Sequence, residues 1–182
     1  MSPNVNRLSS NLISDDEKRR IAALRELMDL AQNDDGDLLF IPPLLVVLDD
    51  GSAECRQMAS WSLGKMAQMD MGDESELDPL VASLLDDDDE VRENAAWALG
   101  ELAGQHIGSQ AELEPLIGLL HDVNGTTRGM AAWALGRLAQ RMGLFDERSL
   151  IPLESLACDK SLYVSKGAEY ALQRLREKLQ AR

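Results

Sequence analysis

Residues 95–104 read AAWALGELAG, and this stretch decides the fold. It surrounds one large aromatic residue, Trp97, with alanine, leucine and glycine, a composition that suits a closely packed helix. The same pattern returns 36 residues to either side, at Trp61 and Trp133, and Tyr170 follows 37 residues after Trp133. Self-similarity at a fixed period predicts a repeat architecture.

Several other columns of residues share these offsets. They are Pro43, Pro79, Pro115 and Pro152; Asp50, Asp86, Asp122 and Asp159; Leu63, Leu99, Leu135 and Leu172; Gly64, Gly100 and Gly136, ending at Gln173; and Arg56, Arg92 and Arg128, ending at Ser165. We expect about five helix pairs in one domain, 1–182. The units fall near 3–35, a degenerate N-terminal cap, then 37–71, 73–107, 109–143 and 146–181, a C-terminal cap.

Each unit predicts a short helix, an aspartate-rich turn and a longer helix. A proline stands early in the first helix, as in ELDPLVASLL (76–85), where N–H groups have no helical partner. The turn DDDDE (86–90) supplies N-cap oxygens for the second helix, VRENAAWALGELA (91–103). In the first unit, SDDE (14–17) predicts a capping box, and IAALREL (21–27) echoes WALGEL (97–102).

This pattern resembles HEAT-type repeats, specifically the short class named after phycobilisome lyase subunits, in which PLxxLLxDxxxxVRxxAAxALGxL recurs. The third unit carries it in Pro79–Leu80, Asp86, Val91–Arg92, Ala95–Ala96 and Ala98–Leu99–Gly100, and the fourth carries it again. The resemblance covers nearly all of 37–181. It implies an all-α, right-handed α-α superhelix, an α-solenoid, whose second helices line the inner face. It implies no particular function.

Helical geometry separates the tryptophans from the buried stripe. At 100° per residue, Val91, Ala98 and Leu102 lie within about 60° of Ala95, whereas Trp97 lies about 200° away. We therefore expect an aromatic ladder on the inner face, made of Trp61, Trp97, Trp133 and Tyr170. It predicts a partner-binding surface, oriented by the charges of Glu93, Glu101, Arg137 and Arg174. Alternatively, each ring packs on glycine and alanine of the neighbouring unit, and a ladder can do both.

The aspartate and arginine columns predict structure rather than catalysis, because they recur so regularly. Each Asp is expected to cap its turn, and each Arg to pair with that Asp or with its equivalent in the neighbouring unit. The predicted structural ladder comprises Asp50, Asp86, Asp122, Asp159, Arg56, Arg92 and Arg128.

No pattern in the sequence predicts a catalytic residue, a metal or a cofactor. The acidic run 86–89 lacks the glycine and distal glutamate of an EF-hand, and His106 and His121 have no Cys or His at ligand spacing. We expect Cys55 and Cys158 to be small buried residues rather than a disulfide or a nucleophile.

Net charge and hydropathy disfavour two classes of function, nucleic-acid binding and membrane insertion. The net charge of −14 opposes binding of nucleic acid, although residues 109–182 hold nine acidic and ten basic residues. The longest apolar run, LLFIPPLLVVL (38–48), is too short to span a membrane, and we expect a cytoplasmic protein. The sequence predicts a non-catalytic scaffold or adaptor for another protein, with its oligomeric state open. The alternatives are an accessory subunit of a bilin chromophore lyase and, disfavoured by the charge, a HEAT-like DNA-repair glycosylase.

Overall fold

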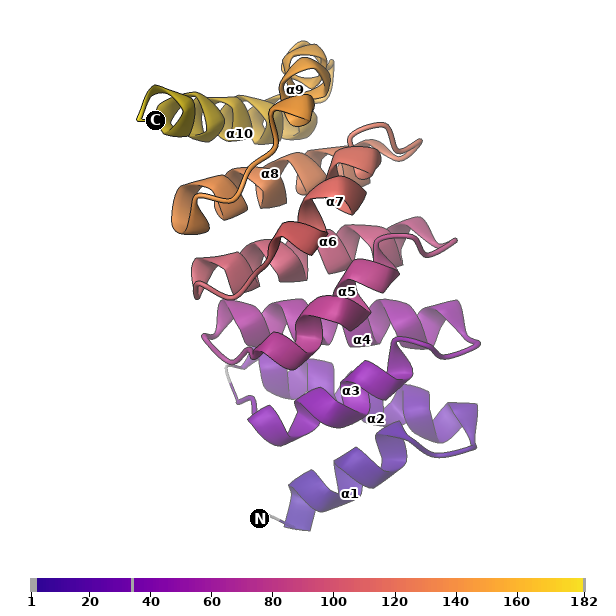
Figure 1. Cartoon of the computed structure of the whole chain (residues 1–182). Coiled ribbons are helices and arrows are strands. Elements are labelled where there is room, and N and C mark those ends of the chain that lie inside the picture. The colour runs from indigo at the N-terminus through magenta and orange to yellow at the C-terminus, as the bar shows by residue number, and fades with distance from the viewer. Residues whose placement is uncertain (1–2, 34, 182) are drawn as a thin grey trace.

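The computed structural model describes residues 3–33 and 35–181, and these residues form ten α-helices without a strand. The helices stack as five consecutive pairs, as Figure 1 shows. The pairs are α1 (Pro3–Leu12) with α2 (Glu17–Gln32), α3 (Ile41–Val47) with α4 (Ala53–Gln68), α5 (Leu77–Ser83) with α6 (Asp89–Gly104), α7 (Leu113–Leu119) with α8 (Gly125–Met142), and α9 (Leu150–Leu156) with α10 (Leu162–Gln180). The predicted all-α solenoid is confirmed.

Odd-numbered and even-numbered helices form two layers of the stack (Figure 1). Each even-numbered helix packs on the next, from α2 to α10, and each odd-numbered helix packs on its own partner. The stripe predicted for α6 is the contact surface, because Val91, Ala95, Ala98 and Leu102 are fully buried. Alanine at these positions lets the helix backbones approach closely, and leucine fills the space between the layers.

A turn of 3₁₀ helix precedes each odd-numbered helix from α3 onward. These turns are η1 (Leu38–Phe40), η2 (Glu74–Glu76), η3 (Gln110–Glu112) and η4 (Glu147–Ser149). Two of them are closed by capping boxes, Asp73 with Glu76 and Ser109 with Glu112. Both glutamates are fully buried. Burial raises the pKa of each to about 7, although a backbone N–H donated by Asp73 or Ser109 opposes the rise.

An aspartate–arginine ladder joins the repeats along the edge where the two helices of each pair are connected. Arg56 donates to Asp86 of the next repeat through Nε at 2.7 Å and Nη2 at 2.9 Å, and Arg92 contacts Asp122 in the same way at 2.7 and 3.1 Å. Arg128 reaches Asp159 at 3.2 Å. Each of these arginines therefore bonds to the aspartate one repeat further along the chain.

Each aspartate of the ladder also organises its own turn. The Asp86 carboxylate accepts the backbone N–H of Asp88 at 2.9 Å, and Arg92 donates to the Asp86 carbonyl at 2.8 Å. Burial by itself would raise the pKa of Asp122, but hydrogen bonds from Arg92 and from the Asn124 backbone outweigh it, and the pKa lies below its usual value. The ladder thus fixes both the turn and the stacking of consecutive repeats.

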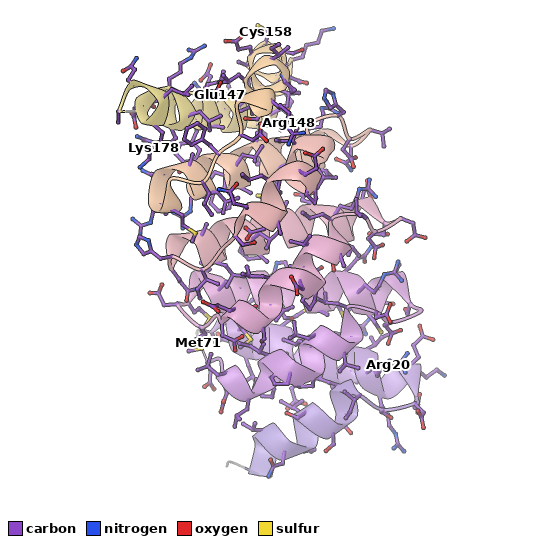
Figure 2. The ribbon with its side chains drawn as sticks, in the orientation of Figure 1. Arg20, Met71, Glu147, Arg148, Cys158 and Lys178 are labelled. Carbon is purple, nitrogen blue, oxygen red and sulfur yellow. The ribbon has the colours of Figure 1, made fainter. Side chains whose placement is uncertain are left out.

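The first helix pair corrects two expectations from the sequence. Asp16, not Ser14, is the N-cap of α2, and its carboxylate accepts the Lys18 backbone N–H at 3.0 Å, so the predicted capping box at 14–17 is wrong. Since Asp16 corresponds to Asp88, the N-cap of α6, the echo of residues 21–27 is displaced by about one helical turn. In the corrected register Arg20 joins the ladder, where it contacts Asp50 at 2.6 Å at the edge of the stack (Figure 2).

The cysteines do not share one environment. Both are free thiols; Cys55 is buried as expected, but Cys158 is exposed, so the expectation of burial was wrong for Cys158. Cys158 lies in the turn after α9, and the residue at the same place after α7, His121, is exposed as well. That turn faces solvent in each repeat, which sets the exposure whatever the residue type.

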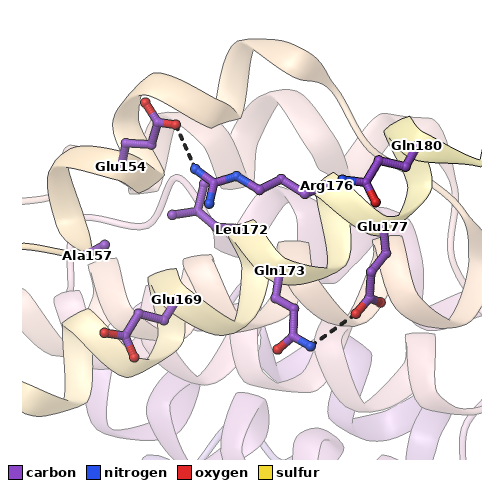
Figure 3. Close-up of a pocket in the computed structure, with 8 residues that line it drawn as sticks. All are labelled: Glu154, Ala157, Glu169, Leu172, Gln173, Arg176, Glu177 and Gln180. Carbon is purple, nitrogen blue, oxygen red and sulfur yellow. Dashed lines mark hydrogen bonds and ion pairs between the residues drawn. The ribbon is translucent and has the colours of Figure 1, made fainter.

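The far side of α10 is polar where α4, α6 and α8 carry a glycine against the next repeat. Gln173 replaces that glycine and donates to Glu177 at 3.0 Å, and Arg176 pairs with Glu154 of α9 at 2.9 Å (Figure 3). Within the described residues, no helix is both long and apolar enough to cross a membrane.

Candidate partner-binding face

The aromatic ladder lies on the even-numbered helices, where each ring covers the glycine of the preceding repeat. The distances from a Cβ built on the glycine to the nearest ring atom are 2.5 Å for Gly64 and Trp97, 2.2 Å for Gly100 and Trp133, and 2.6 Å for Gly136 and Tyr170. A side chain at these glycines would therefore collide with the ring. Trp61, which has no such glycine in α2, lies 6.4 Å from Trp97 between ring centroids.

All four rings are half-buried, so packing and exposure occur together in the ladder. One side of a ring contributes to the contact between repeats, while the remaining part reaches solvent. Tyr170 also donates its hydroxyl to Gln140 of α8 at 2.7 Å. The aromatic face, by which we mean the surface formed by these four rings and their neighbours on α4, α6, α8 and α10, is therefore both a structural contact and an exposed surface.

Two of the predicted orienting charges bind each other. Arg137 of α8 reaches Glu101 of α6 at 3.4 Å and donates from Nε to the Gly100 carbonyl at 3.1 Å. Glu101 also accepts the indole N–H of Trp97 at 3.1 Å, and the guanidinium of Arg137 lies 5.3 Å from the centre of the Trp133 ring. These charges hold the tryptophans in fixed orientations.

The other two predicted charges are less constrained. Arg174 lies 5.4 Å from the centre of the Tyr170 ring and pairs with Glu177 at 3.0 Å. Glu93 accepts the hydroxyl of Thr126 at 2.6 Å. Since Thr126 is neutral, this contact does not neutralise the charge of Glu93.

A pocket of about 530 Å³ opens in the aromatic face where α6, α8 and α10 meet. Trp97 and Trp133 form one side, and Met130, Leu162 and Tyr163 contribute further apolar surface. Leu162 is 70% exposed and Tyr163 is 46% exposed, so the mouth of the pocket presents apolar surface to solvent. Concave sites lined mostly by aromatic and aliphatic groups are typical of ligand and partner recognition.

The sequence explains why the hollow lies at this point of the stack. Gly129 stands where α6 has Glu93, and Gly167 stands where α8 has Met130, so two side chains are missing at one helix crossing. A Cβ at Gly167 would lie 2.6 Å from the Gly129 carbonyl oxygen, which shows how closely α8 and α10 approach. The two glycines thus create the floor of the pocket.

Tyr163 is the aromatic residue of this face that the sequence analysis missed, along with its neighbours Leu162 and Gly167. It occupies the second position of α10, where α4 and α6 carry Glu54 and Glu90, and its ring covers Gly129. Burial raises its pKa to about 12, and the nearby carboxylate of Glu93 adds to the rise. Following the column of Glu54 and Glu90 into the last repeat would have identified an aromatic residue in place of an acid.

Among the described residues, no group of three or more His, Cys, Asp or Glu side chains is arranged to hold a metal ion. Glu76 and Glu112, whose pKa values burial raises most, each cap the start of an odd-numbered helix and lie outside the pocket. The aromatic face can therefore make apolar contacts through its rings and electrostatic contacts through the charged side chains beside them.

Comparison with known proteins agrees with this architecture. A model of HEAT repeats matches residues 5–100 and 86–173. The chain belongs to the HEAT-repeat family. No curated protein matches the sequence significantly. The family predicted from the repeat pattern is therefore confirmed at the level of HEAT repeats.

Solved structures extend the likeness to the whole stack. A designed armadillo repeat protein in complex with the peptide (KR)4 is 26% identical, with a TM-score of 0.78 over 97% of this chain and 88% of that one. A structure of computationally designed armadillo repeat proteins for modular peptide recognition is 25% identical, with a TM-score of 0.77 over 97% of this chain and 87% of that chain. The complex of CpcE and CpcF of phycocyanin lyase from Nostoc sp. PCC7120 is 20% identical, with a TM-score of 0.73 over 95% of this chain and 65% of that chain.

Proposed function

We propose that this HEAT-repeat protein is a non-catalytic scaffold or adaptor that binds a polypeptide segment of a partner protein along the aromatic face. The observation that carries the proposal is the half-buried aromatic ladder beside an apolar pocket with an exposed mouth. Clustered exposed aromatic groups are characteristic of binding hot spots. Stacked repeats supply the extended surface on which a segment can lie.

The similar designed armadillo proteins support this proposal, since one is in complex with a peptide and others were designed for modular peptide recognition. The likeness to the phycocyanin lyase complex supports the fold alone at 20% identity. The net charge of −14 favours a protein partner over nucleic acid, whose phosphates require neutralisation by cations.

Site-specific photo-cross-linking tests the proposal. A benzophenone amino acid at position 162, at the mouth of the pocket, is compared with the same group at position 151 on α9, where Ile151 is 80% exposed. We expect a partner from native lysate to be linked at 162 and not at 151. Linkage to the same proteins at both positions, or only at 151, would contradict a role for the aromatic face.

A double substitution, Trp97→Ala with Trp133→Ala, gives an independent readout. Because each ring packs on a glycine, this variant loses stability as well as exposed surface, and its helicity must first be verified by circular dichroism. If the folded variant retains the partner, the rings serve packing alone.

A further inference from the structure

The pocket between α6, α8 and α10 differs from the rest of the aromatic face because its hollow is encoded by substitutions. The equivalent crossing of α4 and α6 is filled by side chains, and there Asn94 donates to the Gln57 carbonyl at 3.3 Å. At the crossing of α8 and α10 the corresponding residues are Gly129 and Gly167. Gly129 belongs to the fourth repeat and Gly167 to the fifth, and the fifth also carries Tyr163 where α4 and α6 have an acid, so this junction combines two glycines with an added aromatic ring.

The charges at the rim of this pocket have opposite signs on its two sides. Glu93 precedes the lining residue Trp97 by one turn of α6, and its carboxylate accepts the neutral hydroxyl of Thr126. Lys166 lines the pocket on the α10 side and pairs with Glu169 at 2.8 Å. Both members of that pair are more than half exposed, so a partner's carboxylate can compete for the ammonium group.

The arginines of α8 add little to this polarity. Arg128 and Arg137 are paired with Asp159 and Glu101, so Glu93 on α6 and Lys166 on α10 set the charge on the two sides of the pocket. A polypeptide that crosses the stack from α6 to α10 therefore passes from an acidic to a basic environment. Packed helices lie roughly 8–10 Å apart, and an extended chain advances about 3.3 Å per residue, so about three residues span each repeat.

We propose that the pocket takes one bulky apolar side chain of a partner peptide, whose flanking residues are basic over Glu93 and acidic over Lys166. This inference rests on the proposed function and specifies the partner's chemistry. The apolar side chain lies over the backbone of Gly129 and Gly167, against Trp97, Trp133 and Tyr163. The flanking charges, placed within about three residues on either side, fix the direction in which the segment lies.

A random-sequence peptide library, displayed on phage and selected on the immobilised full chain, tests this inference because it requires no candidate partner. Enriched peptides are synthesised, and their binding is followed by tryptophan emission, since two of the three tryptophans line the pocket. We expect the enriched sequences to share a bulky apolar residue between a basic and an acidic one. Enrichment of sequences without a bulky apolar residue would overturn the inference.

Two substitutions at exposed apolar positions form a matched pair for the selected peptides. Tyr163→Glu introduces the residue that α4 and α6 carry at the same position, where an acid suits a helix N-terminus. Ile151→Asp makes a similar change on α9. We expect affinity to fall about tenfold or more for Tyr163→Glu and to stay unchanged for Ile151→Asp. Equal affinity for Tyr163→Glu and the unaltered chain would overturn the inference.

Charge reversal tests the polarity separately. Lys166→Glu should lower the affinity of the selected peptides. Replacing the acidic residue of the peptide by lysine should restore binding to this variant. A loss that the altered peptide does not restore would overturn the assigned acidic flank.

The remaining outcomes distinguish this inference from the function on which it rests. Peptides that bind Tyr163→Glu normally but lose affinity for the folded Trp97→Ala and Trp133→Ala double variant would leave the proposed function standing and remove the pocket's role. A library that enriches nothing would count against both. A dimer of this chain in analytical ultracentrifugation that Tyr163→Glu dissociates would show that a second copy covers the pocket, which also overturns the inference.

Discussion

The aspartate–arginine ladder and the aromatic face are built from the same repeats, yet they tolerate variation very differently. Along the ladder, Arg20, Arg56, Arg92 and Arg128 each meet the aspartate one repeat further on. On the aromatic face, the position of Glu93 becomes Gly129 and then Lys166 in the following repeats. The residues that repeat without change are those that every pair of neighbouring repeats needs in order to stack. The residues that vary belong to a surface that is specific to one pair of repeats.

The largest effect should follow from breaking the ladder at its centre. Arg92 and Asp122 are 12% and 7% exposed, and Arg92 also donates to the Asp86 carbonyl. Arg92→Ala leaves the Asp122 carboxylate buried without its partner, so we expect a loss of about 3 kcal/mol in the free energy of unfolding. Urea denaturation followed by circular dichroism measures it.

An exposed ion pair provides the control for that loss. Arg148 is 64% exposed and contacts Glu114, which is 70% exposed, as well as Asp146. Arg148→Ala should therefore cost much less stability than Arg92→Ala. Comparable losses in both variants would show that burial does not distinguish the ladder from ordinary surface pairs.

A smaller effect should follow from adding a methyl group beneath a ring of the aromatic ladder. A Cβ at Gly100 would lie 2.2 Å from Trp133, so Gly100→Ala must displace the ring or separate α6 from α8. Although alanine favours the helix by about 1 kcal/mol, overpacking costs typically 1–3 kcal/mol. We expect a net loss of up to about 2 kcal/mol, together with a shift of tryptophan emission.

Gly118 sharpens this test because it lies within helix α7 with nothing within 4 Å of its added Cβ. Gly118→Ala should raise stability by about 0.5–1 kcal/mol, through helix propensity alone. Opposite signs for the two glycines are expected. Stabilisation at both positions would mean that the tryptophan yields easily and that the ladder contributes little to the contact between repeats.

Repetition made the fold predictable from the sequence, and departures from repetition limited what the sequence could say about the site. The columns of Asp86, Arg92, Trp97 and Gly100 placed the helices and their shared turns because each recurs at one offset. The first unit was assigned to the wrong register because it has Arg25 at the position of the tryptophan. Only the alanine and leucine residues of 21–27 were then available to align with the later repeats. The capping box at 14–17 failed for the same reason.

The pocket could not be predicted because it arises from what two residues lack. Gly129 and Gly167 leave a hollow only when α8 and α10 are packed together, and a helical wheel treats each helix alone. Likewise, the sequence predicts Glu101 and Arg137 as charges directed at a partner, but they bind each other across the helix junction. Both the pocket and the Glu101–Arg137 pair depend on contacts between repeats, and these contacts cannot be read from the sequence of a single helix.

A further small effect concerns the turns between repeats and depends on pH. Glu76 and Glu112 are buried, with pKa values near 7 in the folded protein against 4.5 ordinarily. Between these values the folded state binds more protons than the unfolded state, so stability falls as pH rises from about 4.5 to 7. Glu112→Gln keeps an acceptor for the Ser109 backbone N–H without a charge to bury.

We therefore expect Glu112→Gln to match the unaltered protein near pH 4.5 and to exceed it at pH 8. One pKa unit corresponds to about 1.4 kcal/mol, but local opening of the short η3 turn limits the penalty, and a gain of about 1 kcal/mol is expected. Urea midpoints at both pH values measure the difference, with Glu74→Gln, at an exposed position of η2, as the control for loss of one charge. A gain for Glu112→Gln that is equal at both pH values would assign the effect to net charge rather than to burial of the Glu112 carboxyl.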